Sequence, residues 1–384
     1  MPATGTIDVG GAVRTTRLPG VTRIDVQNLG AAVPEPLRDP ERDPEARKAW
    51  IARHNQALLD ALESAAAGAG GDFNAFAEWT TMCGGAYDFK DINTRRRERF
   101  DGAYRAAITT VFGMDIGTGL AARVQATAFV PDPGVAFQRF AWQPRALYDT
   151  EFMALAPAVT VRFAGAKQLF LSGVMDWDRQ HQQQHTDDAR AQIRNVLERI
   201  IASFEEAGGS RQDVLRLRPI LPTPDCVALL EQEVAELWAD IPPVITLWAG
   251  LPMPKGQFAE IQAYGMLGEE SATVTQNSAT TGAVPVRVAR GKPFAMFVAG
   301  PFGRADQTPA ETAGQVRTCL ADHDLSQEDV CTAYVAARDR AAADQFAAAD
   351  VVPADSLHVI AARPEADLAG APLRVEITAG KLTA

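Results

Sequence analysis

The pattern of apolar and polar residues in the middle of the chain predicts a β-hairpin. Apolar residues alternate with other residues over positions 159–163, which is typical of a strand with one buried face. Residues 164–167 contain a glycine and favour a turn, and a short apolar strand over residues 169–171 follows. This second strand ends at Ser172 and Gly173.

The hairpin is followed by segments with the period of a helix. Between residues 192 and 204 the apolar residues recur three and four positions apart, which places them on one face, and the glycine pair at 208–209 predicts the end of the helix. A strand over 213–220, a second one-faced helix over 227–237 and two strands near 244–248 and 258–264 complete the block. The order ββαβαββ predicts an α+β fold with both helices on one face of a mixed sheet.

The same order recurs toward the end of the chain, from about residue 286. A strand over 296–300 matches the second hairpin strand, and the helix that begins near Gln315 matches the one that begins near Gln192. Glu260 lies 68 positions after Gln192, and Glu376 lies 61 positions after Gln315. A repeat of this length indicates two copies of one structural unit.

A fainter third copy lies at the start of the chain, where the segment 34–43 replaces the usual loop. It has a strand at 24–26, a helix from His54 and closing strands at 108–111 and 122–130, and its spacing sets Arg123 opposite Glu260. The predicted domains are therefore a degenerate one over residues 20–133, a second over 134–270 and a third over 284–384. The aromatic segment 137–148 is predicted to be a linker that packs between domains.

Composition and charge exclude several classes of function. The net charge of −11 argues against binding to nucleic-acid phosphates, and no apolar run is long enough to cross a membrane. The four cysteines form no CxxC pair, which fits a reducing cytoplasm and predicts neither disulfides nor a zinc site. His181 and His185 have the spacing of a helical metal pair, but with no third ligand in the pattern a polar loop is the better interpretation. We therefore expect no metal, no cofactor and a cytoplasmic protein.

The middle and last blocks resemble the Rid family, also called YjgF/YER057c/UK114, of small trimeric imine and enamine deaminases. The resemblance is carried by GAKQLFLSGV, QIRNVLERIIASFEEAGG, the GLP at residues 250–252 and AEIQAYG in the middle block, and by AMFVAGPFG, QVRTCL and RVEITAG in the last. It implies tandem Rid-like (chorismate-mutase-like) domains. These would form an intramolecular pseudo-trimer, or a higher homo-oligomer of it, around a central β-barrel, with substrate clefts where domains meet.

The resemblance also implies which residues carry the chemistry. In the family a glutamate on the last strand handles the attacking water, which implies Glu260 and Glu376 as catalytic residues, with Arg123 at the same place in the first copy. The family's carboxylate-clamping arginine is missing from all three copies, where its place falls on Ile108, Pro243 and Asp355. Arg105, three residues before the first of these, and Arg123 remain as candidates for binding an anionic substrate.

Three residues at the end of the hairpin strands complete the predicted site. Ser172 is a candidate ligand for the substrate, although strand-end serines usually bond to nearby backbone. Gly173 and Gly300 are expected to let the backbone approach the cleft closely. Glu260 and Arg123 have alternatives too, a solvent-facing carboxylate and a surface ion pair.

The predicted function is that of a divergent Rid-type enzyme acting on a small imine, enamine or anionic metabolite, with a biosynthetic pathway as one setting. Hydrolysis of a C=N bond, or a related tautomerisation, dehydration or cyclisation, is the expected chemistry. A chorismatase-like reaction on a dicarboxylate is one alternative, since chorismatases also resemble fused Rid-type domains. A non-catalytic ligand-binding or scaffold protein is the other.

Overall fold

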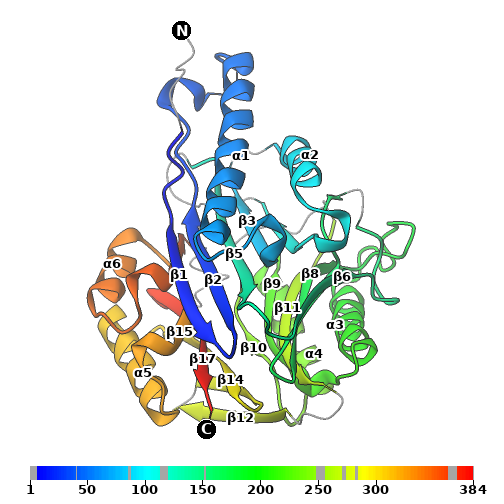
Figure 1. The fold of residues 1–384 in the computed structure, drawn as a ribbon, viewed down its shortest axis with the longest axis vertical. Helices are drawn as coiled ribbons and strands as arrows, with labels where there is room; N and C mark the ends of the chain where they lie inside the picture. The colour runs from blue at the N-terminus through cyan, green and yellow to red at the C-terminus, as the bar shows by residue number, and fades with distance from the viewer. Residues whose placement is uncertain are drawn as a thin grey trace.

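Three α+β units follow one another along the chain, with their sheets toward the centre and their helices outside (Figure 1). The computed structural model describes residues 7–39, 41–84, 88–112, 120–150, 153–247, 256–269, 274–281, 284–361 and 370–383. The GLP segment at 250–252 lies outside these ranges. The predicted fold class, α+β with three tandem units, is confirmed.

Unit 1 has a five-stranded sheet in the order β1-β2-β5-β3-β4. Its elements are β1 (Ala12–Leu18), β2 (Val21–Leu29), α1 (Pro44–Ala67), β3 (Phe76–Cys83), α2 (Phe89–Arg99), β4 (Ala107–Val111) and β5 (Ala122–Pro131). Helix α1 starts well before the predicted start at His54, because the Asp43 side chain accepts a hydrogen bond from the Ala46 amide and caps the helix there. The sheet starts with β1, upstream of the predicted boundary at residue 20.

Unit 2 has a six-stranded sheet in the order β10-β9-β11-β8-β7-β6. Its elements are β6 (Phe137–Trp142), β7 (Ala158–Phe163), β8 (Ala166–Met175), α3 (Ala189–Glu206), β9 (Val214–Ile220), α4 (Pro224–Leu237), β10 (Val244–Ile245) and β11 (Glu260–Gly268). The apolar face predicted for the first helix is buried along α3. The segment expected to be a linker instead begins with strand β6, which pairs antiparallel with β7 at the edge of the sheet.

Unit 3 repeats this plan, with the sheet order β12-β13-β14-β17-β15-β16. Its elements are β12 (Thr275–Thr281), β13 (Val284–Arg290), β14 (Phe294–Phe302), α5 (Pro309–Asp322), β15 (Val330–Ala337), α6 (Arg340–Ala348), β16 (Leu357–Ala361) and β17 (Leu373–Leu382). Strand β12 pairs with β13, so this sheet starts upstream of the predicted boundary at residue 284.

The inner faces of the three sheets share one apolar core. Phe129 of unit 1, Phe163 of unit 2 and Phe294 of unit 3 pack in a row, with ring centroids 6.1 Å and 4.9 Å apart. Within the described residues, backbone pairing forms three separate sheets and does not close into a barrel. The centre of the pseudo-trimer is therefore packed side chains between sheets.

The units follow one another around a ring, and we call the contact between two units a seam. At each seam the short parallel edge strand of one unit contacts the second hairpin strand of the next: β4 contacts β8, β10 contacts β14, and β16 contacts β2. The third of these contacts, between unit 3 and unit 1, returns the ring to its start.

A buried arginine crosses each seam and donates to backbone carbonyls of the neighbouring unit. Arg139 of unit 2 donates to Phe76 and Arg105 carbonyls of unit 1, and Arg287 of unit 3 donates to Gln212, Ile241 and Pro242 carbonyls of unit 2. Arg14 of unit 1 donates to Glu328 and Val330 carbonyls of unit 3. Each crossing arginine thus joins its own unit to the backbone of the neighbouring unit.

The strand register shows which positions of the three units are equivalent. In each unit the last strand pairs with the second hairpin strand across a register shift, between Val26 and Leu29, Ile261 and Ala263, or Ala299 and Phe302. Aligning these shifts makes three sets of positions equivalent across the units. They are Gln125, Gln262 and Glu376; Arg123, Glu260 and Arg374; and Asn28, Gly173 and Pro301.

This register corrects two matches made from the sequence. Glu376 is equivalent to Gln262 and not to Glu260, so it lies two residues, or about 6.6 Å, further along the strand. Gly300 is equivalent to Ser172 and not to Gly173. The predicted equivalence of Arg123 and Glu260 holds.

Candidate functional site

The seam between units 1 and 2 brings several of the predicted site residues together. Glu260, at the start of β11, lies against Gly173 near the end of β8, so closely that a Cβ on Gly173 would lie 2.1 Å from a Glu260 carboxylate oxygen. The Tyr148 hydroxyl donates to the Gly173 carbonyl at 2.9 Å. Burial raises the pKa of Tyr148, and the charge of Glu260 raises it further.

The space beside Glu260 is very small. Glu260, Gly173, Tyr148 and Ser172 line a cavity of about 20 Å³, which is enough for one water molecule. The Ser172 side chain is buried and its hydroxyl donates to the Pro157 carbonyl at 3.4 Å, as expected of a serine that bonds to nearby backbone. This part of the seam can hold a water beside a carboxylate, but a metabolite does not fit there without movement of side chains. A wider cavity of about 890 Å³ lies elsewhere between units 1 and 2, beside Phe129 and Arg139, and Glu260 does not line it.

Glu376 lies in the centre of the molecule, in an ion-pair cluster between units 2 and 3. Its carboxylate accepts hydrogen bonds from Arg218 at 2.6 and 3.2 Å, and Arg216 lies 3.8 Å away and also pairs with Glu78 at 2.7 Å. Burial acts to raise the pKa of Glu376, but the two guanidinium groups outweigh it, so the pKa is lowered. Glu376 is 1% exposed and lines none of the described cavities, so the geometry does not favour an acid–base role.

The seam between units 3 and 1 is closed by hydrogen bonds. Arg123 donates to the Val359 carbonyl. Asn28 donates to the Leu357 carbonyl and accepts from the Val359 amide, and the His358 ring accepts from the Asn28 amide. Burial lowers the pKa of Arg123, and the nearby charge of Arg340 lowers it further. The guanidinium predicted to bind an anion is thus used to join two units.

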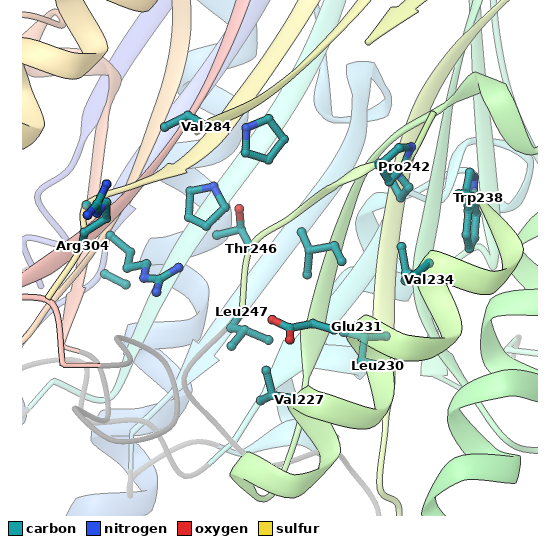
Figure 2. Close-up of a pocket in the computed structure, with 18 of the residues that line it drawn as sticks. Val227, Leu230, Glu231, Val234, Trp238, Pro242, Thr246, Leu247, Val284 and Arg304 are labelled. Atoms are coloured by element: carbon teal, nitrogen blue, oxygen red, sulfur yellow. The ribbon is translucent and has the colours of Figure 1, made fainter. Parts of the chain in front are cut away.

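The seam between units 2 and 3 holds a cavity of about 680 Å³ (Figure 2). Helix α4 forms one wall with apolar side chains, and β10 with the following residues forms the floor. The end of β14 and the start of β17 form the other side. The lining residues that the argument uses are Val227, Leu230, Val234, Trp238, Thr246, Glu231, Arg304 and Arg374. Pockets of 300–1,000 Å³ with apolar walls and a few polar groups are typical of small-molecule sites.

Three charged residues give this cavity its polarity. Arg374 occupies the position equivalent to Glu260, so the cleft presents a cation where the seam of units 1 and 2 presents a carboxylate. Burial lowers the pKa of Arg374, and the charge of Glu231 across the cleft opposes this. Glu231 points from α4 into the cavity, and Arg304 lies on the opposite side (Figure 2). Arg304 also pairs with Asp306 at 3.0 Å on the exposed rim.

Thr246 connects this cavity to the central cluster. It follows β10 and lines the cavity, and its side chain contributes to lowering the pKa of Glu376. Glu376 thus lies behind the cavity floor. Its negative charge is close to the cavity, but its side chain does not line it.

Arg105 and Gly300 lie apart from the large cavity's lining. Arg105 precedes β4, and its carbonyl accepts a hydrogen bond from the crossing Arg139. Gly300 has a φ of 139°, and a Cβ there would lie 2.7 Å from the Val375 carbonyl oxygen. This backbone conformation favours glycine, so Gly300 shapes the strand that leads to Pro301 at the cavity edge.

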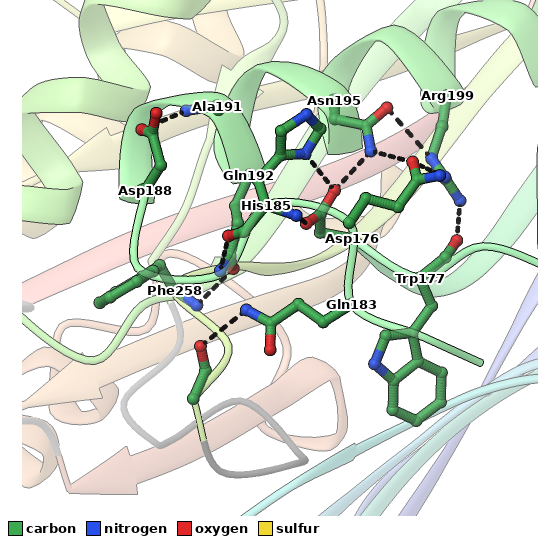
Figure 3. Close-up of polar contacts among 12 residues, drawn as sticks. Asp176, Trp177, Gln183, His185, Asp188, Ala191, Gln192, Asn195, Arg199 and Phe258 are labelled. Carbon is green, nitrogen blue, oxygen red and sulfur yellow. Dashed lines mark hydrogen bonds and ion pairs between the residues drawn. The ribbon is translucent and has the colours of Figure 1, made fainter.

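The loop that carries His181 and His185 is held by polar contacts, and Figure 3 shows those of His185. His185 donates or accepts through Nδ1 at 3.0 Å from the buried Asp176, whose carboxylate also accepts from the His185 amide and from Asn195. His181 instead contacts the Asp149 carbonyl. Among the residues that the structure describes, no group of three or more metal-ligating side chains occurs.

The residues of the large cavity were missed at the sequence level. Arg374 lies inside the RVEITAG segment, at the position on the last strand that Arg123 and Glu260 occupy in the other two units. Glu231 and Trp238 lie on or next to the predicted second helix, on a part of it that contacts unit 3 across the cavity.

Within the described part of the chain, no helix is long and apolar enough to cross a membrane.

No family model and no curated protein sequence matches this chain. Among solved structures it is similar to a chorismatase, at 15% identity over 66% of this chain and 77% of that chain, with a TM-score of 0.45. It is also similar to RidA from the Antarctic bacterium Psychrobacter sp., at 22% identity over 33% of this chain and 96% of that chain, with a TM-score of 0.28. A member of the YjgF/YER057c/UK114 family from Mycobacterium tuberculosis matches at 22% identity over 33% of this chain and 98% of that chain, with a TM-score of 0.27.

These likenesses concern the fold and give no information about activity. In fold, about a third of the chain is similar to each of these Rid-family proteins.

Proposed function

We propose that this protein binds a small carboxylate-bearing metabolite in the cleft between units 2 and 3 and acts on it there as a divergent Rid-type enzyme. One observation carries the proposal: of the three equivalent positions Arg123, Glu260 and Arg374, Arg374 is the one that lines a ligand-sized cavity among the described residues. The cavity beside Glu260 has about 20 Å³, against about 680 Å³ beside Arg374, and the seam of units 3 and 1 around Arg123 is closed by hydrogen bonds. A further cavity of about 890 Å³ lies between units 1 and 2, beside Phe129 and Arg139, and none of the three equivalent positions lines it.

The lining of the cleft supports a carboxylate as the recognised group. The Arg374 guanidinium can donate two parallel hydrogen bonds to a carboxylate, and its partial burial strengthens such a pair. The apolar face of α4, with Val234 and Trp238, would pack against the body of the ligand. The family's clamp is thus replaced by an arginine from a different strand of the unit.

The same cleft supports hydrolysis of a C=N bond. Glu231 is the one carboxylate among the described lining residues, so it is the group that would accept a proton from an attacking water. The water oxygen bonds to the imine carbon, the C–N bond breaks, and a carbonyl compound and ammonia leave. In this assignment Glu231 takes the role that the sequence resemblance implied for Glu260 and Glu376.

A chorismatase-like reaction on a dicarboxylate is a second candidate, and one observation favours it. That reaction needs two cationic anchors in one cleft, and both Arg304 and Arg374 line this one.

Binding and catalysis are tested by separate measurements. Calorimetric titration with 3-phenylpropionate tests recognition: we expect binding to the wild type, at least a tenfold loss in Arg374→Met, and no loss in Arg338→Met, an exposed arginine of the same unit paired with Asp339. Release of ammonia from imines formed by an amino-acid oxidase tests catalysis, and it should fall in Glu231→Gln. Equal binding by wild type and Arg374→Met would contradict the proposed site. Binding without any turnover would favour the non-catalytic alternative.

A further inference from the structure

The large cleft contains opposed charges whose balance limits what it can bind. Arg374 and Glu231 line it from different units, Arg374 from the start of β17 and Glu231 from the middle of α4. Figure 2 shows the Glu231 side chain extending from the helix into the cavity, on the side opposite Arg304. Arg304, Arg374 and Glu231 are the charged groups among the described lining residues.

Arg304 is already matched by a carboxylate of its own segment. Its guanidinium pairs with both oxygens of Asp306, at 3.1 and 3.0 Å, and both side chains are more than half exposed. An exposed pair of this kind is weak, so Arg304 can turn toward a ligand at little cost. The pairing of Arg304 is therefore no strong barrier to a second carboxylate.

Glu231 is the stronger barrier to a second carboxylate on the ligand. A ligand carboxylate held by the half-buried Arg374 lies in a cleft that the exposed Glu231 also faces, so any further negative charge on the ligand meets a like charge, which water screens in part. A hydrogen-bond donor or a positive group on the ligand would instead find an acceptor there. Arg374 alone would attract both monocarboxylates and dicarboxylates, and Glu231 makes the cleft distinguish between them.

We infer that Glu231 is a specificity-determining residue: across the cleft from Arg374, it admits ligands with one carboxylate and disfavours dicarboxylates. The inference rests on the proposed function, because it assumes that the cleft between units 2 and 3 binds carboxylates. It opposes the dicarboxylate candidate above.

Three probes with the same benzyl group separate the charge effects, and they are measured by calorimetry on the full chain at one salt concentration. They are 3-phenylpropionate with one negative charge, phenylalanine with an added ammonium, and benzylmalonate with two carboxylates. In the wild type we expect benzylmalonate to bind roughly threefold to tenfold more weakly than 3-phenylpropionate. In Glu231→Gln this ratio should approach one, and phenylalanine should lose affinity.

The matched control is Glu236→Gln. Glu236 also lies on α4, but it pairs with Arg190 and Arg194 on the helix surface and does not line the cavity. It should leave all three affinities unchanged.

The outcomes are distinguishable. If the probes bind but Glu231→Gln leaves the ratio of the two acids as it is in the wild type, the inference is wrong while the binding site stands. If benzylmalonate binds the wild type more tightly than 3-phenylpropionate, the inference is also wrong and a dicarboxylate reaction gains support. If the folded protein binds none of the probes, the proposed site itself is overturned, and the charge selection falls with it.

Discussion

The ion pair between Glu376 and Arg218 gives the sharpest test of the central cluster. The sequence resemblance makes Glu376 a catalytic residue, whereas the structure places it in a buried pair that joins units 2 and 3. The two interpretations predict different results for Glu376→Ala: lost turnover with normal stability, or lost stability. The variant therefore decides between a chemical and a structural role.

The expected loss of stability is large. Arg218 is 1% exposed and would lose both hydrogen bonds to the carboxylate, while Arg216 keeps Glu78. Removing one partner of a buried ion pair costs about 3–5 kcal/mol because the other charge stays desolvated. Replacing both, as in the double variant Glu376→Leu with Arg218→Met, should recover most of this loss.

Urea unfolding followed by circular dichroism measures the effect. The transition midpoint of Glu376→Ala should fall well below that of the wild type. The control Glu328→Ala removes an exposed glutamate that lies 3.9 Å from Arg14, and it should change the free energy of unfolding by less than about 1 kcal/mol. The reasoning would be refuted if Glu376→Ala unfolded at the wild-type urea concentration, or if the double variant were less stable than either single one.

Three further predictions concern pH and backbone packing. The folded-state pKa of Glu376 is lowered, so its ion pair with Arg218 contributes full stability above the unfolded pKa of about 4.3 and loses it as pH falls through the lower folded value. In Glu376→Gln the melting temperature should therefore fall less steeply at acid pH than in the wild type. An unchanged acid dependence would contradict the contribution of the ion pair. Gly173→Ala puts a Cβ against the Glu260 carboxylate and should cost about 1–3 kcal/mol, whereas Gly314→Ala, in α5 with nothing within 4 Å, should gain about 0.5–1 kcal/mol. Equal midpoints for these two variants would show that the close approach is not real. Arg287→Met leaves carbonyls of unit 2 without their donor and should lower the free energy of unfolding by about 2–4 kcal/mol. Amide hydrogen exchange at the seam of units 2 and 3 should become faster. Protection from exchange equal to that of the wild type would contradict a role of Arg287 in joining the two units.

The sequence pattern sufficed for the units and for most of their elements. The apolar periods over the strand 159–163 and the helix near 192–204 identify both elements, although β7 is buried on both faces and not on one as expected. The edge strands β6 and β12 were missed, since an edge strand has little burial to mark it: β12 is mostly exposed, and β6 pairs on one side only.

The candidate site could be predicted only in part, and the reason is geometric. Matching the letters of AEIQA and RVEITA sets Glu376 level with Glu260, whereas the strand pairing makes Glu376 equivalent to Gln262, two positions further along. Whether a seam is open depends on contacts between residues far apart in sequence. Asn28 with Leu357 closes one seam, and the separation of α4 from β14 leaves another open.

The equivalent positions Gln125, Gln262 and Glu376 have a consequence for how such a protein can vary. In an assembly of three identical chains, a glutamate at this position would be repeated three times near the axis, and each copy would need its own arginine. Here one gene encodes all three positions separately. Glu376 of unit 3 pairs with Arg218 of unit 2, while Gln262 of unit 2 donates to the Thr80 hydroxyl of unit 1. A single charged pair can therefore be placed behind the floor of one cleft. A mutation at this position changes one unit only, whereas in three identical chains it would change all three.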